Sequence, residues 1–93
     1  MSQITLEHRH GLADADARTT LDRVADGLRR RYDMQTAWHD DRLRFWRSGV
    51  EGSIALQPGC LRLEAALQFP LSLMQARIER EIRDEIARRF GSG

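Results

Sequence analysis

Two hydrophobic patterns of different period meet at Phe69-Pro70 and constrain what the chain can form. Before this point, apolar and polar residues alternate from Leu61 to Leu67, as expected of a strand with one buried face. After it, every fourth residue is apolar, which predicts a helix with one buried face. The members of this stripe are Met74, Ile78, Ile82, Ile86 and Phe90. A chain of 93 residues forms one hydrophobic core, so we expect a single domain over 1–93.

The same two periods recur through the rest of the chain. The predicted strands are 4–10, 34–38, 43–47, 50–57 and 61–68, and the predicted helices are 12–32 and 71–90. Short turns separate the last four strands, which favours antiparallel pairing between neighbours. The fold class predicted is α+β: a single antiparallel sheet of about five strands in the order β-α-β-β-β-β-α, with two helices packed on one face. We expect the tail 91–93 to be frayed.

Glycine and proline predict local geometry at three places. Gly52 indicates either a β-bulge or a close approach of two backbones. Pro58-Gly59 predicts a tight turn with glycine at positive φ. The last helix has two possible starts, because Ser72 with Gln75 fits a capping box while Pro70 fits the first helical position.

Charged residues on the last helix are spaced to form ion pairs across one turn, each with a small stabilising effect. The expected pairs are Arg77–Glu81, Glu79–Arg83, Arg80–Asp84, Asp84–Arg88 and Glu85–Arg89.

The charge balance argues against a polyanionic partner. Fifteen basic and fourteen acidic residues give a net charge of +1, so nucleic acid binding is not expected. No run approaches the roughly 20 apolar residues of a membrane-spanning helix. The first residues show no targeting pattern, and Cys60 cannot form an internal disulfide. We therefore expect a cytoplasmic protein.

The strand alternation places one set of mostly polar side chains on the sheet face away from the helices. This set comprises Gln35, Ala37, His39, Arg44, Trp46, Glu51, Ser53, Arg62, Glu64 and Ala66. A large aromatic residue between arginines is typical of a contact surface. Arg44, Trp46 and Arg62 are therefore the candidate residues for binding a partner or a surface.

No set of residues predicts catalysis or a cofactor. His8 and His10 lie two apart on a predicted strand, so both imidazoles point to one side, but a metal needs a third ligand that the spacing does not supply. We interpret them as surface histidines near a strand end and predict no metal site. Cys60, His39 and Asp40 are the residue types of a nucleophilic set without its sequence signature. We expect a non-enzymatic protein without cofactors.

Several segments resemble a small bacterial family, the polyhydroxyalkanoic acid system proteins. The resemblance covers nearly the whole chain and is carried by Trp38, 43–45, 47–54 and 78–82. The stretch Arg47-Ser48-Gly49-Val50-Glu51-Gly52-Ser53-Ile54 is the most specific, because generic strand patterning does not dictate two glycines in that register. The family tends to have a glycine soon after the tryptophan, where this chain has His39-Asp40-Asp41.

The resemblance implies a role close to the storage of polyhydroxyalkanoate, a bacterial polyester, since such proteins are encoded near genes for its synthesis or granule packaging. It implies no catalytic residues. We expect a small accessory protein that contacts the granule polymer or a granule protein. One alternative is a small acyl-ligand carrier with a pocket between sheet and helix, although the apolar residues are barely enough to fill their own interface. Another is an RNA-binding module, and a homodimer through an edge strand is possible.

Overall fold

The computed structural model describes residues 2–90, so the expected frayed tail at 91–93 lies outside the described residues. The strands are β1 (Ser2–Arg9), β2 (Gln35–His39), β3 (Arg42–Arg47), β4 (Val50–Gln57) and β5 (Cys60–Leu67). The helices are α1 (Asp14–Tyr32), a short 3₁₀ helix η1 (Leu71–Met74) and α2 (Gln75–Phe90). This order confirms the predicted β-α-β-β-β-β-α arrangement.

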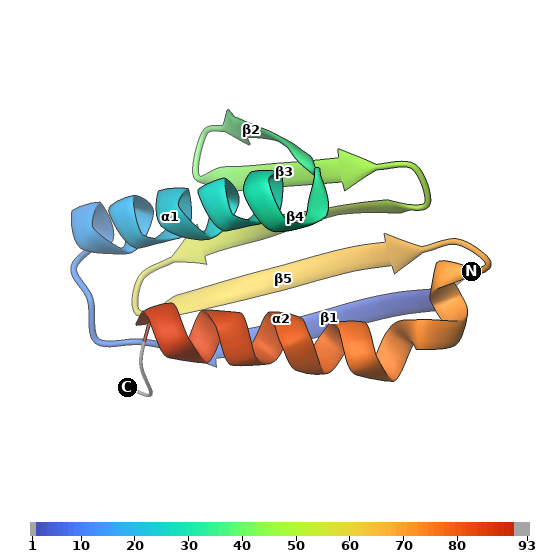
Figure 1. Cartoon of the computed structure of the whole chain (residues 1–93). Helices are drawn as coiled ribbons and strands as arrows, with labels where there is room; N and C mark the ends of the chain where they lie inside the picture. The colour runs from blue at the N-terminus through green and yellow to red at the C-terminus, as the bar shows by residue number, and fades with distance from the viewer. Residues whose placement is uncertain (1, 91–93) are drawn as a thin grey trace.

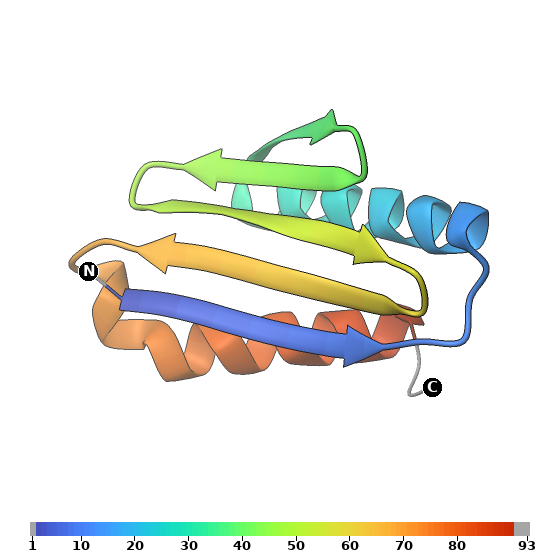
Figure 2. The ribbon, with the colours of Figure 1, turned by 180° about the vertical axis from the view of Figure 1, so that it is seen from behind.

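The strands form one antiparallel sheet in the order β1-β5-β4-β3-β2. Tight hairpins connect β2 to β5 in sequence, whereas β1 pairs along the full length of β5, from Ser2 opposite Leu67 to Arg9 opposite Cys60. Both helices lie on the same face of the sheet, and the other face is uncovered (Figures 1 and 2). The α+β class and the placement of the helices are as predicted.

The core lies between the sheet and the two helices. Its largest fully buried side chains are Ile4, Leu21, Leu43, Ile54, Leu61, Leu63 and Leu67. The stripe of α2 is buried at Ile86 and Phe90 but only partly buried at Ile78 and Ile82. The two helices therefore close the core fully only toward the C-terminal end of α2.

Gly52 lies at the centre of the sheet, directly between Phe45 and Ala65 on the neighbouring strands. Pairing continues on both sides of it without an inserted residue, so the bulge interpretation is wrong. A Cβ at Gly52 would lie 2.6 Å from Cζ of Phe45 and 2.5 Å from the carbonyl oxygen of Glu64. The glycine thus gives the Phe45 ring room to lie across β4, which confirms the predicted close approach.

The turns between strands also agree with the sequence. Gly59 has the expected positive φ, at 71°. The β2–β3 hairpin turns at Asp40-Asp41, and Asp40 adopts a left-handed φ of 56°. Aspartate tolerates this conformation better than most residues, so the hairpin forms without the glycine that the related family favours there.

The starts of both helices differ from the expectation. The first begins at Asp14, and the last segment opens with η1, so that the α-helix begins only at Gln75. No side chain caps η1, and Pro70 precedes it rather than occupying its first position. Nε2 of Gln75 instead donates a hydrogen bond to the carbonyl oxygen of Gln3 at 3.0 Å. The capping-box interpretation is therefore wrong, because Gln75 ties the helix to β1.

Ion pairs on α2 form at three of the expected positions: Arg77–Glu81 at 3.5 Å, Glu79–Arg83 at 3.4 Å and Glu85–Arg89 at 2.9 Å. Among residues 2–90, the expected pairs of Asp84 with Arg80 and Arg88 are not formed within 4.0 Å, and Arg88 contacts Glu85 at 3.1 Å instead. Charges therefore gather around Glu85.

Candidate functional site

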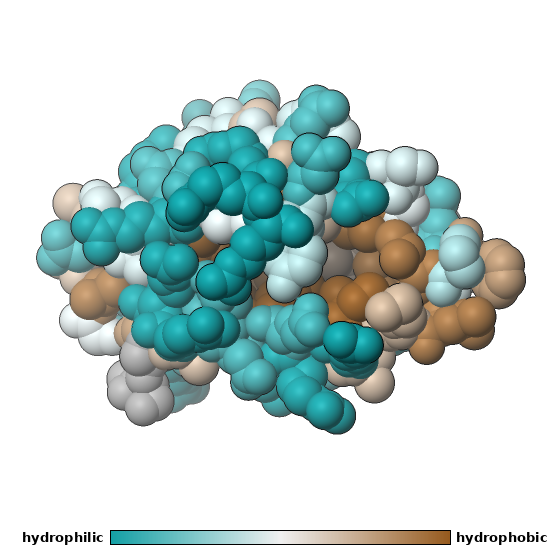
Figure 3. Space-filling model, in the orientation of Figure 1, coloured by the Kyte–Doolittle hydropathy of each residue, from teal (hydrophilic) through white to brown (hydrophobic). Residues whose placement is uncertain are grey.

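A hollow opens between α1 and α2 where the two helices diverge. Its floor is the sheet, at Phe45, Ile54 and Leu63, and its walls include Leu28 of α1 and Ile78 of α2. We call it the interhelical groove; its volume is about 280 Å³. Figure 3 shows hydrophobic surface within the gap between the hydrophilic surfaces of the two helices. The expectation that the apolar residues only fill their own interface is wrong here.

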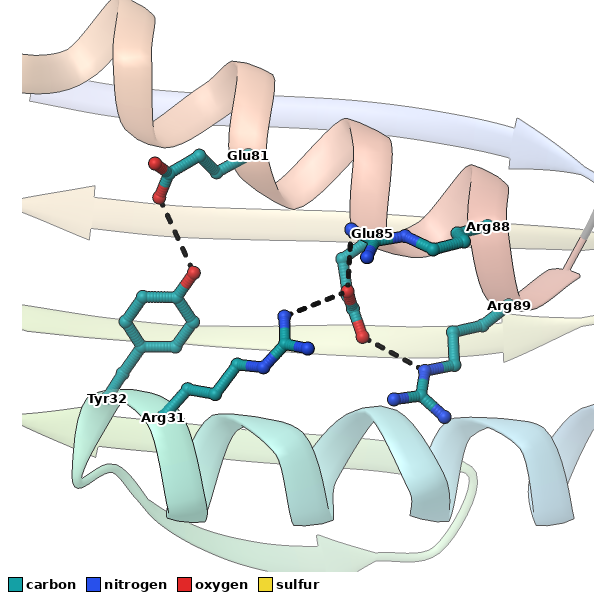
Figure 4. A network of polar contacts seen from close by, with 6 residues as sticks. All are labelled: Arg31, Tyr32, Glu81, Glu85, Arg88 and Arg89. Carbon is teal, nitrogen blue, oxygen red and sulfur yellow. Dashed lines mark hydrogen bonds and ion pairs between the residues drawn. The ribbon is translucent and has the colours of Figure 1, made fainter.

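Two polar contacts span the groove from α1 to α2 (Figure 4). The hydroxyl of Tyr32 donates a hydrogen bond to Oε2 of Glu81 at 3.4 Å, and Nη1 of Arg31 lies 3.6 Å from Oε2 of Glu85. Burial, reinforced by the negative charge of Glu81, raises the pKa of the Tyr32 hydroxyl. The tyrosine therefore remains a neutral hydrogen-bond donor throughout the physiological pH range.

Glu85 is the most enclosed carboxylate of this network, with a side chain only 17% exposed. Burial is the largest single influence and raises its pKa, but the hydrogen bond from Arg89 and the charges of Arg88, Arg89 and Arg31 together outweigh it. The resulting pKa of Glu85 lies below the ordinary glutamate value. Its charge is thus neutralised by three arginines.

Arg47 provides a further cation at the groove. It ends β3 with its side chain on the helix side, and its Nη1 donates a hydrogen bond to the carbonyl oxygen of Tyr32 at 2.6 Å. No carboxylate within the described part of the chain lies within 4.0 Å of the Arg47 guanidinium, in contrast to Arg31. Arg47 thus leaves donor groups available for an anion.

Exposed apolar side chains gather where β5 leads into η1 and α2. Phe69 and Leu73 are each 76% exposed, and Met74 is 44% exposed. We call these three residues the apolar corner. Met74 also lines the interhelical groove, so the corner continues into the groove. Figure 3 shows the corner and the groove as one hydrophobic region.

The sequence contains a signal for this corner in the spacing of its apolar residues. Phe69 and Leu73 do not follow the four-residue spacing of the stripe, so they cannot lie on the same buried helical face. Leucine and phenylalanine outside the stripe, beside a proline that interrupts regular structure, indicate apolar side chains left at the surface.

The predicted contact residues share the uncovered sheet face but do not form one cluster. Arg44 is exposed and Trp46 is half-buried. By strand register, Trp46 lies level with Glu51 and Ala66, whereas Arg62 lies level with Arg42, at the opposite end of the face. Arg44 lies between the two levels.

The uncovered face is polar, and some of its charged side chains are paired. Arg62 contacts Glu7 at 3.6 Å and Glu64 at 3.2 Å. A wide, shallow hollow of about 310 Å³ lies over this face and is lined by polar residues such as Arg44 and Ser53. Polar lining of this kind suits hydrogen bonding to a partner rather than burial of an apolar chain.

The second tryptophan, Trp38, faces the helices as expected and is partly buried. Its Nε1 donates a hydrogen bond to Oδ1 of Asp22 at 2.6 Å, and the Arg18 guanidinium lies 4.0 Å from the ring centroid. These contacts fasten α1 to the edge strand β2, so Trp38 has a structural role.

The two histidines near the end of β1 do converge on the helix side. Their rings approach Phe90, with centroid distances of 6.5 Å for His8 and 5.4 Å for His10. His10 is only 5% exposed, and its Nδ1 accepts a hydrogen bond from the backbone N–H of Leu12 at 3.2 Å. The surface interpretation is therefore wrong for His10, because the end of α2 covers it.

Neither a metal cluster nor the nucleophilic set assembles. Across residues 2–90, no group of three or more His, Cys, Asp or Glu side chains is placed to hold a metal ion. His39 lies on the edge strand β2, three strands away from Cys60 on β5, which corresponds to roughly 14 Å. The Cys60 thiol instead donates to its neighbour's carbonyl oxygen, on Leu61, at 3.5 Å.

No helix in the described residues has the length and apolar character needed to cross a membrane.

Comparisons with known proteins give one match. No curated protein and no solved structure matches the chain. The family model described as "Putative polyhydroxyalkanoic acid system protein" matches residues 4–90, which include every helix and nearly all of the sheet. The chain therefore belongs to the family of polyhydroxyalkanoic acid system proteins.

Proposed function

We propose that this protein is a non-enzymatic accessory protein of polyhydroxyalkanoate storage, which contacts the polyester surface of the granule through the apolar corner. Family membership supports the connection to the polymer. The observation that carries the proposal is the exposure of Phe69 and Leu73, 76% each, together with that of Met74 in the same short segment. Large apolar side chains exposed together are typical of a contact surface.

The chemistry of the corner suits an aliphatic polyester. Burying a leucine or phenylalanine side chain stabilises a complex by about 1.5–3 kcal/mol. Three such side chains offer a useful affinity without any charged group in the contact. Neither the polymer nor the corner carries charge, so the contact should persist at high salt.

The uncovered sheet face is a second candidate surface. Arg44, Trp46 and Arg62 offer hydrogen bonds and one aromatic ring, a combination more suited to a protein of the granule than to polyester. The RNA-binding alternative has less support, because Trp46 is the single large aromatic on this face and Arg62 is paired with glutamates. The two edge strands, β1 and β2, are where a homodimer would form.

Sedimentation with protein-free polyhydroxybutyrate particles tests the proposal. The double variant F69S/L73S should lose most of the bound fraction, while W46S/R44E should bind as the wild type does. Both sets of substitutions lie at exposed or half-buried positions, and circular dichroism would verify that each variant folds.

Other results of this sedimentation experiment would assign the contact to a different surface or partner. Loss of binding only in W46S/R44E would assign the contact to the sheet face. Absence of binding by the wild type would exclude direct polymer contact and favour a granule protein as partner. Fractionation of cells with and without stored polymer would then test whether the protein, expected in the cytoplasm, accompanies the granule at all.

A further inference from the structure

We propose that the interhelical groove binds one medium-chain alkanoate, with the acyl chain between α1 and α2 and the carboxylate at Arg47. This site is separate from surface contact by the apolar corner and does not depend on it. It concerns a single small ligand, and only Met74 of the corner also lines the groove.

The hollow is large for a protein interior of this size. Protein cores contain few voids larger than a water molecule. The groove measures about 280 Å³, whereas a dry cavity of about 150 Å³ accommodates benzene. A chain on the order of ten carbon atoms would fill a space of this volume.

Polar contacts join the two helices across the groove. Tyr32 reaches Glu81 and Arg31 reaches Glu85 across the opening, so α1 and α2 meet there through long polar side chains (Figure 4). Leu28 and Ile78 beneath them remain only partly buried. The groove therefore lies between the helices with polar contacts across it and apolar walls on both sides.

The lining selects the chemistry of the chain. Floor and walls consist of leucine, isoleucine, valine, alanine and methionine with Phe45, and the polar side chains lie at the rim. An aliphatic chain loses no hydrogen bond on entering such a space, whereas a sugar or a nucleotide would leave polar groups unpaired.

The charges at the rim select an anionic head group. Glu85 is neutralised by Arg31, Arg88 and Arg89, and Glu81 contacts Arg77 at 3.5 Å. Arg47 alone of the rim cations in the described structure has a backbone carbonyl as its partner instead of a carboxylate. A guanidinium with free donors binds a carboxylate through two parallel hydrogen bonds.

Two ligands of equal chain length and opposite charge test both parts of the proposal. Decanoate should raise the Tm by an amount that grows with the logarithm of its concentration, and decyltrimethylammonium should raise it far less. Calorimetry below the micelle concentration of each should give one site per chain. Equal responses to the two ligands, or no response to decanoate, would overturn the proposal.

Two variants localise the site. Ile78→Trp should fill the groove and abolish the response to decanoate. Arg47→Gln should weaken decanoate binding about ten-fold, while the control Arg44→Gln, with the same charge change on the opposite face of β3, should leave it unchanged. Arg47 is exposed, so this variant remains informative even where Ile78→Trp fails to fold.

Three further outcomes also test the proposal. Binding that is unaffected by Arg47→Gln, or equally weakened by Arg44→Gln, would refute the assignment of the head group. A concentration-dependent dimer on size-exclusion chromatography, dissociated by decanoate or by Ile78→Trp, would mean that a second copy occupies the groove. Polyester sedimentation of Arg47→Gln should remain at the wild-type level, which separates this proposal from that of the apolar corner.

Discussion

The two faces of the sheet differ in how their side chains are packed and paired. The helix side buries most apolar residues of β1, β3, β4 and β5 and still leaves a groove of about 280 Å³. The uncovered side has no helix over it, and its Arg62 is paired with Glu7 and Glu64. The face that is covered is thus the one with unfilled apolar space. In a small domain, incomplete packing can provide more binding capacity than an open face.

The largest expected effect is on the free energy of unfolding, and it distinguishes the closed part of the covered face from the open part. Leu21 and Leu28 lie two turns apart on α1; Leu21 is 0% exposed, while Leu28 lines the groove. Leu21→Ala should lower the free energy of unfolding by about 2–5 kcal/mol, because it leaves a cavity. Leu28→Ala should cost about 1 kcal/mol, since part of its side chain already faces open space. Urea denaturation measures both, and equal losses would mean that the groove is closed in solution.

The next effect concerns the centre of the sheet. Gly52→Ala should destabilise the protein by about 1–3 kcal/mol, because the added methyl group collides with Phe45 and with the backbone of β5. The neighbouring Ser53→Ala, whose side chain is on the uncovered face, should change stability by no more than about 0.5 kcal/mol. Thermal denaturation of both variants provides the test. A neutral Gly52→Ala would show that the Phe45 ring has room to move aside, into the groove.

A smaller effect depends on pH. Glu85 has a lowered pKa in the folded protein, so its charge contributes stability above the ordinary glutamate pKa of about 4.3, and this contribution is lost as the pH falls through the folded value. Glu85→Gln should therefore cost roughly 1 kcal/mol at pH 7, with the difference from wild type closing below about pH 4. Denaturation curves at pH 7, 5 and 3.5 test this. A difference that persists unchanged at pH 3.5 would point to lost packing rather than lost charge.

The smallest effect is expected on the uncovered face. Arg62→Ala removes two ion pairs whose side chains are about half exposed, and such pairs contribute less than about 0.5 kcal/mol each. The stability measured at high salt should be the same for variant and wild type. A loss well above 1 kcal/mol would mean that this face is as tightly organised as the covered one.

Local patterns were sufficient to predict most of the fold. Alternation from Leu61 to Leu67 assigned the inner and outer sides of β5, because neighbouring side chains on a strand must point to opposite faces. The stripe of α2 identified its buried side for the same geometric reason. What local patterns could not predict was the start of α2, since Gln75 is held by the hydrogen bond that it donates to Gln3 of β1, which is remote in the sequence.

The site was less predictable, because it depends on distances between elements remote in sequence. His10 is buried only because Phe90 packs against it. The groove is lined by both helices and the sheet, and Tyr32 meets Glu81 across it, a pairing that neither segment encodes alone. The choice of Arg44, Trp46 and Arg62 followed from the face they share, whereas their separation along that face required the register of the sheet.

The pairing of β1 with β5 has a consequence for how the protein is made. Ser2 leaves the ribosome well before its partner Leu67, because the two residues are far apart in the sequence. The meander of β2 to β5 has closer partners and can assemble first. Until β1 joins it, one edge of β5 offers unpaired backbone groups to any other nascent chain. We therefore expect the time between synthesis of β5 and docking of β1 to be the period when the protein is most prone to aggregate.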